Sequence, residues 1–304
     1  MRPLKPHARE YLKAAAEIAE RVLKEAEKII KPGIKIIEIC EKLEQLIRRL
    51  GGRPAFPVNI SINDIAAHYS SPPQDPKRIP HGSLVKVDIG VHVNGYIVDI
   101  AKTLNLGSGL TDLIKATEDA LEAAIDHIKA GVRVSEIGAV IEREIKRYGY
   151  NPIKNLAGHA MERYNLHAGL SIPNVSSPRP LGILAPKLHE GMIVAIEPFA
   201  TTGKRAYVVD DRPISIFKLT EKKPKTRDES RIYSLICRRC QMLPFSLRWF
   251  DEITGSGKAV KTFTKMISEG IIYAYPPLRE VDKNPVAQAE TTVIVHKNGA
   301  ERLV

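Results

Sequence analysis

The stretch LVKVDIGVHVNGYIVDIAKTL, residues 84–104, decides the fold of this chain. Apolar and small or polar residues alternate along it, which is typical of two β-strands with one face buried. Asn94 and Gly95 divide the stretch, and this dipeptide favours a two-residue type I′ turn because both of its positions need a positive φ. The turn predicts an antiparallel hairpin in which Val93 pairs with Tyr96.

The hairpin register brings two acidic residues together. Counting back from the turn places Gly90 opposite Asp99 and Asp88 opposite Ala101. Side chains alternate between faces, so Asp88 and Asp99 share one face as diagonal neighbours, roughly 7–8 Å apart. Two solvated acids on an exposed sheet are the plain alternative, but the flanking Val and Ile favour a buried sheet, where a divalent cation would neutralise both carboxylates.

A helical repeat organises the sequence around this hairpin. Residues 33–54 align without a gap with residues 131–152, an offset of 98. Each copy predicts an amphipathic helix between a leading glycine and a closing Gly-x-x-Pro. A further helix is expected before each copy, at about 8–30 and about 111–130. The identical pairs are Gly33/Gly131, Glu38/Glu136, Ile39/Ile137, Glu44/Glu142, Ile47/Ile145, Arg49/Arg147, Gly51/Gly149 and Pro54/Pro152.

The strands repeat as well. GSLVKVD, ending at Asp88, matches GMIVAIE, ending at Glu197. We therefore expect one catalytic domain over 1–304, with two similar halves at about 8–105 and about 111–304. Chance similarity between two amphipathic helices is the alternative, and the strand match at the same place in each half weighs against it.

The second half needs a returning strand to face Glu197. QAETTVIV supplies it, and Glu290 is expected to lie near Glu197 as Asp99 lies near Asp88. The surplus between the two glutamates, about 202–285, predicts an insertion, and RIYSLICRRCQM and SGKAVKTFTKMISEG within it predict helices.

A histidine completes the candidate metal site. His159, in NLAGHAM, is expected in a loop just beyond the second repeat helix, on the segment that leads to the acidic strands. A lone histidine is more often structural, but this one lies between Gly158 and Ala160 where the chain approaches the carboxylates. Four carboxylates and one imidazole suit two hard or borderline divalent ions and do not suit a structural zinc site.

Composition sets the class of protein. The 304 residues are 43% hydrophobic and 27% charged, as in an ordinary globular protein. The N-terminus lacks the pattern of a signal peptide and no stretch is apolar enough to span a membrane, so a cytoplasmic location is expected. The net charge of +11 could favour nucleic acid or the ribosome, but the basic residues are spread along helices and no specific nucleic-acid site is expected. Cys237 and Cys240 are expected to be ordinary helical residues, with a disulfide as the alternative.

The ordered set Asp88, Asp99, His159, Glu197 and Glu290 resembles the site of the type 2 methionine aminopeptidases. FPVNISINDIAAH, NLAGH, LHAGLSIPN, AIEPFAT, AYPPL and VAQAETTVIV extend the resemblance over nearly the whole chain. The resemblance implies the pita-bread α/β fold, with two pseudo-symmetric halves around an antiparallel sheet and a helical insertion. It points to the short archaeal form, without the long N-terminal extension of eukaryotic members.

The same resemblance implies roles for single residues. All five residues of the set would ligate two divalent ions (Co, Mn, Fe or Zn) that activate a bridging water, and Glu197 would also move a proton to the leaving amine. His68 and His167 would bind substrate and stabilise the tetrahedral intermediate. The methionine pocket would be built from Phe56, Phe199, Tyr275 and Leu278.

The implied reaction is hydrolysis of the first peptide bond of nascent polypeptides, releasing methionine when the second residue is small. A monomer is expected, and the ribosome surface is a candidate partner. Two alternatives remain open: another pita-bread peptidase of the prolidase kind, and a non-catalytic protein of this fold that binds RNA or the ribosome.

Overall fold

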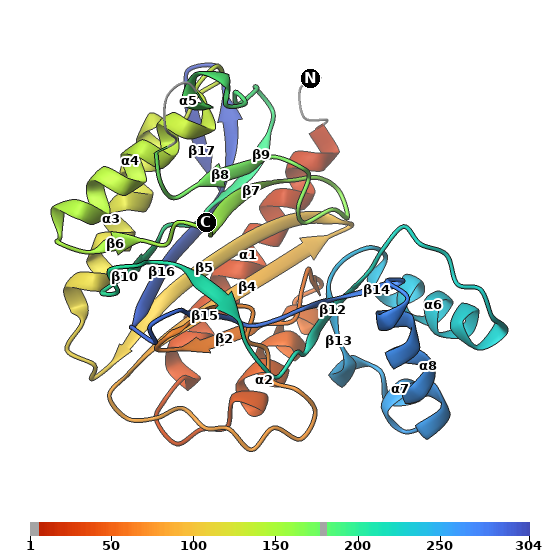
Figure 1. Cartoon of the computed structure of the whole chain (residues 1–304). Helices are drawn as coiled ribbons and strands as arrows, with labels where there is room; N and C mark the ends of the chain where they lie inside the picture. Colours follow the sequence, from red (N-terminus) through yellow and green to blue (C-terminus); the bar gives the residue numbers. More distant parts are fainter. Residues whose placement is uncertain (1–5, 177–180) are drawn as a thin grey trace.

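A computed structural model describes residues 6–176 and 181–304. Its main feature is an 11-stranded antiparallel sheet in which the path β1-β4-β5-β16-β9-β7-β8 crosses the molecule (Figure 1). The remaining four strands pair onto strands along this path. The strands are β1 (Arg53–Pro54), β2 (Asn59–Ile62), β4 (Ser83–Val93), β5 (Tyr96–Leu106), β6 (Asn151–Pro152), β7 (Ala157–Met161), β8 (Ser171–Pro173), β9 (Ile193–Ile196), β10 (Phe199–Thr201), β16 (Val286–His296) and β17 (Gly299–Arg302).

The β4–β5 hairpin has the predicted register. Val93 pairs with Tyr96, and the pairing continues without a shift to Ser83 and Leu106. Asn94 and Gly95 have φ values of 51° and 87°, as a type I′ turn requires. The prediction for this hairpin is confirmed residue by residue.

Four long helices accompany the sheet: α1 (Pro6–Ile29), α2 (Ile36–Arg49), α3 (Thr111–His127) and α4 (Val134–Arg147). The bounds of α2 and α4 differ by 98 at both ends. Each half also contains an equivalent backbone hydrogen bond: Gly33 N donates to Ile79 O in the first half, and Gly131 N donates to Leu188 O in the second. The internal repeat therefore extends from the sequence to the hydrogen-bonding pattern.

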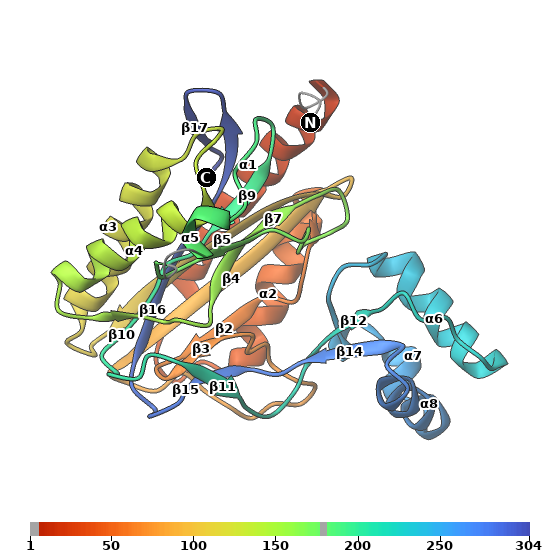
Figure 2. The same cartoon turned by 45° about the horizontal axis from the view of Figure 1, so that its top comes forward.

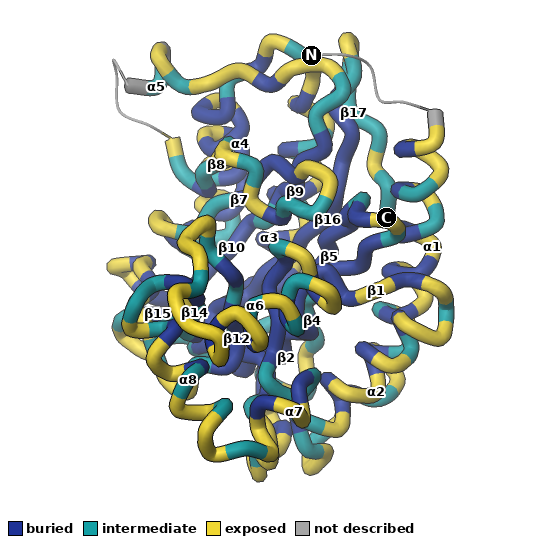
Figure 3. The backbone as a smooth tube through the Cα atoms, turned by 90° about the vertical axis from the view of Figure 1, so that its right-hand side faces the viewer, coloured by how far each residue is buried: buried dark blue, intermediate teal, exposed yellow. Residues whose placement is uncertain are grey.

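The helices cover one face of the main sheet. Val85, Val87, Ile89 and Val91 of β4 share a buried cluster with α1 and α2, while alternate residues of β16 share another with α3 and α4. Because strand side chains alternate, Asp88 and Glu290 lie on the opposite face. The tube in Figure 3 shows the central strands of this sheet largely buried.

The second half differs from the first in register. On β16, Thr291 pairs with Ile196 and Gln288 pairs with Phe199, which sets Glu290 directly across from Glu197. In the first half, Asp88 lies across from Ala101 and is only diagonal to Asp99. The expected correspondence between Glu290 and Asp99 is therefore off by two residues, and Gln288 occupies the place equivalent to Asp99.

The helical insertion stands to one side of the sheet (Figure 2). Its own buried cluster includes Phe217, Ile236, Phe245 and Phe263. The cluster joins a small sheet to several helices: β12 (Ile216–Leu219), β13 (Phe245–Ser246), β14 (Ile272–Tyr275), α6 (Arg227–Cys240), η1 (Leu247–Trp249), α7 (Asp251–Thr254) and α8 (Gly257–Ser268).

A second small sheet connects the insertion to the rest. It contains β11 (Val208–Asp210), β15 (Leu278–Glu280) and β3 (Ile65–Ala67). The short helix α5 (Leu181–Leu184) precedes β9 in the chain. Cys237 and Cys240 both lie on α6 with free thiols. Among residues 6–176 and 181–304, no helix combines the length and apolar character needed to cross a membrane.

Candidate metal centre and substrate cavity

The acidic pair of the hairpin lies at the centre of the main sheet. Asp99 on β5 is 3% exposed, and Asp88 on β4 is partly buried. The side chain of Thr292 holds the backbone of Asp99. The N–H of Asp99 donates to Thr292 Oγ1 at 2.7 Å, and the same hydroxyl donates to the Asp99 carbonyl at 2.8 Å. Thr292 belongs to β16, so this hydroxyl joins the first half to the strand that bears Glu290.

His159 lies on strand β7 rather than in the expected loop. Short as it is, the segment pairs with β8 on one side and β9 on the other, and His159 is opposite Ala195. Its Nε2 lies 3.6 Å from Asp99 Oδ2 and 3.7 Å from Glu197 Oε1. The imidazole therefore faces carboxylates from both halves.

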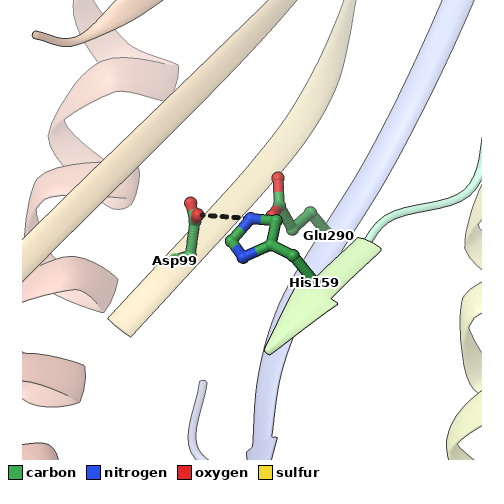
Figure 4. A group of neighbouring side chains, drawn as sticks. All are labelled: Asp99, His159 and Glu290. Carbon is green, nitrogen blue, oxygen red and sulfur yellow. Dashed lines mark ion pairs between the residues drawn. The ribbon is translucent and has the colours of Figure 1, made fainter. Parts of the chain in front are cut away.

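Glu290 brings the third element of the cluster. It pairs with Ala101 of β5, and its Oε2 accepts a 3.0 Å hydrogen bond from Gln288 Nε2. Asp99, His159 and Glu290 each place one potential ligand atom within 4.8 Å of the others, and Figure 4 shows these three side chains converging from three strands.

The charges of this cluster call for a cation. Burial and repulsion from neighbouring carboxylates raise the pKa values of Asp88, Glu197 and Glu290, and burial raises that of Asp99 although His159 opposes the rise. Asp88 Oδ1 and Asp99 Oδ1 are buried without a hydrogen-bond partner. Unpartnered buried carboxylate oxygens beside an imidazole are the donors that divalent ions use, so the residues present fit such ions.

A cavity of about 60 Å³ opens onto this cluster. His68, after β3, and His167, after β7, both line it together with the four carboxylates and His159. The His167 ring lies 4.5 Å from that of His159 between centroids, and the His68 ring meets Tyr275 edge-on at 5.8 Å. Burial lowers the pKa of His68 to about 4 and that of His167 to about 3, so both rings are neutral near pH 7.

The apolar wall differs from the one expected. Phe56 and Tyr275 line the cavity, whereas Phe199 and Leu278 pack in a neighbouring cluster with Ala67. Sequence reasoning missed five further lining residues: Asn59, Ala67, Leu166, Ile216 and Pro244. Asn59, Ala67 and Leu166 lie within motifs that carry the family resemblance, and β2 sets Asn59 directly opposite Asp88. Ile216 and Pro244 reach the cavity from the insertion, and no local pattern marks them.

Comparison with known protein families agrees with this fold and site. Residues 10–234 match the model of metallopeptidase family M24, and the chain belongs to that family. The matched range contains Asp88, Asp99, His159 and Glu197, while Glu290 lies beyond its end.

Named relatives come from archaea. A methionine aminopeptidase of Thermococcus onnurineus is 46% identical over 293 residues, which cover 96% of this chain and 98% of that protein. One of Methanocaldococcus jannaschii is 42% identical over 293 residues, covering 96% and 97%. The chain is thus a metallo-exopeptidase by its relatives, and its resemblance to the archaeal methionine aminopeptidases is confirmed.

Solved structures support the fold. A thermophilic Arx1 matches with a TM-score of 0.84 at 19% identity, covering 99% of this chain and 91% of that one. Methionine aminopeptidase from Thermotoga maritima matches with a TM-score of 0.70 at 24% identity, covering 100% and 98%. The predicted pita-bread fold, with pseudo-symmetric halves and a helical insertion, is confirmed.

Proposed function

We propose that this protein removes the N-terminal methionine from polypeptides by hydrolysing their first peptide bond. The observation that carries the proposal is the cavity in which four carboxylates and His159 form one wall and apolar side chains form another. A charged wall able to hold cations beside a small apolar pocket suits a substrate with a free amine next to an apolar side chain.

In this proposal, the site holds two divalent ions. Their ligands are Asp88, Asp99, His159, Glu197 and Glu290. Such ions, when bound, lower the pKa of a coordinated water and polarise a carbonyl. Asp99 and Glu290 come from neighbouring strands tied by Thr292, so the protein holds the ligand positions through its sheet rather than through loops.

Three residues would handle protons and developing charge. The neutral rings of His68 and His167 can each donate one hydrogen bond to an oxygen that gains negative charge. Glu197, which faces His159 at 3.7 Å and lines the cavity, is our candidate for moving a proton to the leaving amine.

The substrate side chain would lie against Phe56, Tyr275, Ile216 and Pro244. The apolar lining of the cavity suits one flexible apolar side chain such as methionine. The preference for a small second residue is part of the proposal, because the histidines and Tyr275 surround the cavity where that residue would enter. We propose nascent chains as the substrates, and we therefore propose that the protein acts in the cytoplasm.

The test is release of free methionine from the peptide Met-Ala-Ser. Protein stripped with a chelator is assayed with and without added Co or Mn, beside Ala-Pro and Lys-Ala peptides. Metal-dependent release from Met-Ala-Ser alone supports the proposal. Cleavage of the Ala-Pro peptide instead would favour a prolidase-like enzyme, and absence of both turnover and metal binding would favour a non-catalytic protein of this fold.

A further inference from the structure

An arginine from the insertion holds the segment that follows His68. Arg248 lies in η1, and its side chain is 2% exposed. Its Nε donates to Ser71 O at 2.6 Å, and its Nη2 donates to Ser70 Oγ at 3.0 Å. One guanidinium therefore binds two successive residues that start two positions after His68.

The guanidinium is itself fixed by Glu44 of α2. Two parallel hydrogen bonds of 2.9 Å join Arg248 to both carboxylate oxygens, and Trp249 Nε1 donates to the same group at 2.7 Å. The Glu44 side chain is also 2% exposed. Buried ion pairs contribute little net stability, but the two parallel bonds to Glu44 add geometric specificity, and four of the five guanidinium N–H groups have a partner here.

The backbone at His68 needs such support. Its φ of 63° is in the left-handed region, which non-glycine residues adopt only when their surroundings hold them there. The following residues are bound from two other sides: Ile60 N donates to Tyr69 O, and Ser215 Oγ donates to Ser70 O. Arg248 and Ser215 both come from the insertion at about 202–285, so the insertion helps to fix where His68 lies.

The equivalent glutamate of the second half has a different partner. Glu142, which follows Glu44 by 98 residues, accepts hydrogen bonds from Ser176 N and Ser176 Oγ at 2.9 and 2.5 Å. Each half thus uses this glutamate to hold a polar partner. In the first half, the partner is an arginine whose other donors bind Ser70 and Ser71.

We propose that Arg248, anchored by Glu44, is a positioning residue that sets His68 for the reaction, so that the helical insertion takes part in catalysis. This inference rests on the proposed function, in which His68 donates to an oxygen that becomes negative in the transition state. Misplacement of such a donor lowers transition-state stabilisation and leaves ground-state binding nearly intact.

Arg248→Lys is the first test variant, because it keeps a positive charge beside Glu44 and removes the fork that reaches Ser70 and Ser71. Ser70→Ala, the second, deletes only one hydrogen bond and leaves the ion pair. Arg205→Lys is the matched control: Arg205 pairs with Asp282 in the same insertion and makes no bond to η1 or to the His68 segment.

We expect Arg248→Lys to lower kcat on Met-Ala-Ser by roughly tenfold or more, with KM changed by less than about twofold. Binding of a phosphinate analogue of the tetrahedral intermediate should weaken by a factor similar to the loss in kcat, while binding of methionine should not. Ser70→Ala should show a smaller loss of the same kind, and Arg205→Lys should match wild type. Unchanged kcat in Arg248→Lys, or equal losses for analogue and methionine, would overturn the inference.

A second readout does not depend on turnover. In metal-stripped protein labelled with ¹³C-histidine, the His68 ring resonance is assigned by its loss in His68→Asn. It should shift in Arg248→Lys and Ser70→Ala and stay unchanged in Arg205→Lys. An unmoved resonance overturns the positioning role even if wild type cleaves methionine, whereas a wild type that cleaves no methionyl peptide overturns the proposed function alone.

Discussion

The ring of Phe56 lies against the backbone of Gly90, so close that a Cβ at position 90 would overlap ring carbons Cδ1 and Cε1. Gly90 is the residue opposite Asp99 in the hairpin. The aromatic ring takes up the space beside the two aspartates that a side chain at position 90 would fill. The missing side chain therefore sets the position of one cavity wall.

Gly90→Ala should narrow the cavity. The added methyl must displace the Phe56 ring, and overpacking of this kind costs about 1–3 kcal/mol of folding stability. We expect a higher KM for Met-Ala-Ser together with a lower midpoint of urea unfolding. The double variant Gly90→Ala/Phe56→Leu should recover part of both losses, and simple additivity of the two changes would contradict the contact.

Removal of metal should make stability depend on pH. In the metal-free protein, the pKa values of Asp88, Glu197 and Glu290 are raised by burial and mutual repulsion. A carboxyl with a raised native pKa contributes stability that is present below its unfolded value and is lost as pH rises through the native value.

The melting temperature of stripped protein should therefore fall as the pH is raised above about 4, the ordinary carboxyl pKa. Manganese or cobalt at about 100 times its Kd should add about 2.7 kcal/mol and remove most of this fall. Calorimetry at several pH values measures both effects, with Asp88→Asn expected to show a shallower fall without metal. A melting temperature of stripped protein that rises over this range would refute the electrostatic account.

Lys86 should be a source of instability at low pH. It is fully buried, its Nζ donates a 2.7 Å hydrogen bond to Asn63 O, and burial lowers its pKa to about 7. A lysine with a lowered native pKa contributes stability above its unfolded value and loses it as pH falls through the native value.

Lys86→Met keeps the stem without the charge, and it should be more stable than wild type near pH 6, with the advantage shrinking toward about pH 9. Urea unfolding at the two pH values measures this. Lys102→Met, which removes a surface lysine paired with Glu27, is the control and should show no such trend. Equal effects of Lys86→Met at both pH values would show that the buried amine does not titrate as expected.

Comparing substitutions at Gly33 and Gly95 should distinguish the cost of left-handed backbone strain from the cost of steric overlap. Gly95 and Gly33 have φ values of 87° and 86°, but a Cβ at Gly95 would overlap the Tyr164 ring, whereas one at Gly33 would meet nothing within 4 Å. Gly33→Ala should lose about 1–2 kcal/mol from left-handed strain, and Gly95→Ala should lose more. Urea unfolding measures these losses of folding stability. The additional loss in Gly95→Ala should shrink when Tyr164→Ala is added, and equal losses for the two glycine variants would rule out the overlap.

Local rules explain what the sequence predicted. The positive φ demanded at Asn94 and Gly95 fixes the hairpin register, and period-2 alternation then places Asp88 and Asp99 on one face. The gapless offset of 98 similarly anticipates the bounds of α2 and α4. These features depend on neighbours within a few residues, or on a repeat that is visible in the letters.

Features set by distant partners escaped prediction. His159 lies in a strand because β8 and β9 flank it, not because NLAGHAM favours one. Phe199 was expected in the methionine pocket but packs in a separate buried cluster that includes Ile153. The contact between Arg248 and Glu44 spans 204 residues, and nothing local to either residue announces it.

The place of β16 in the main sheet has a consequence for biosynthesis. β16 lies between β5 and β9 and begins at Val286, so a ribosome must translate most of the chain before these two strands gain their shared neighbour. Until then, two half-sheets carry unpaired edges, which are prone to pair with other chains. Glu290 arrives on the same strand, so closure of the sheet and completion of the ligand set coincide during synthesis.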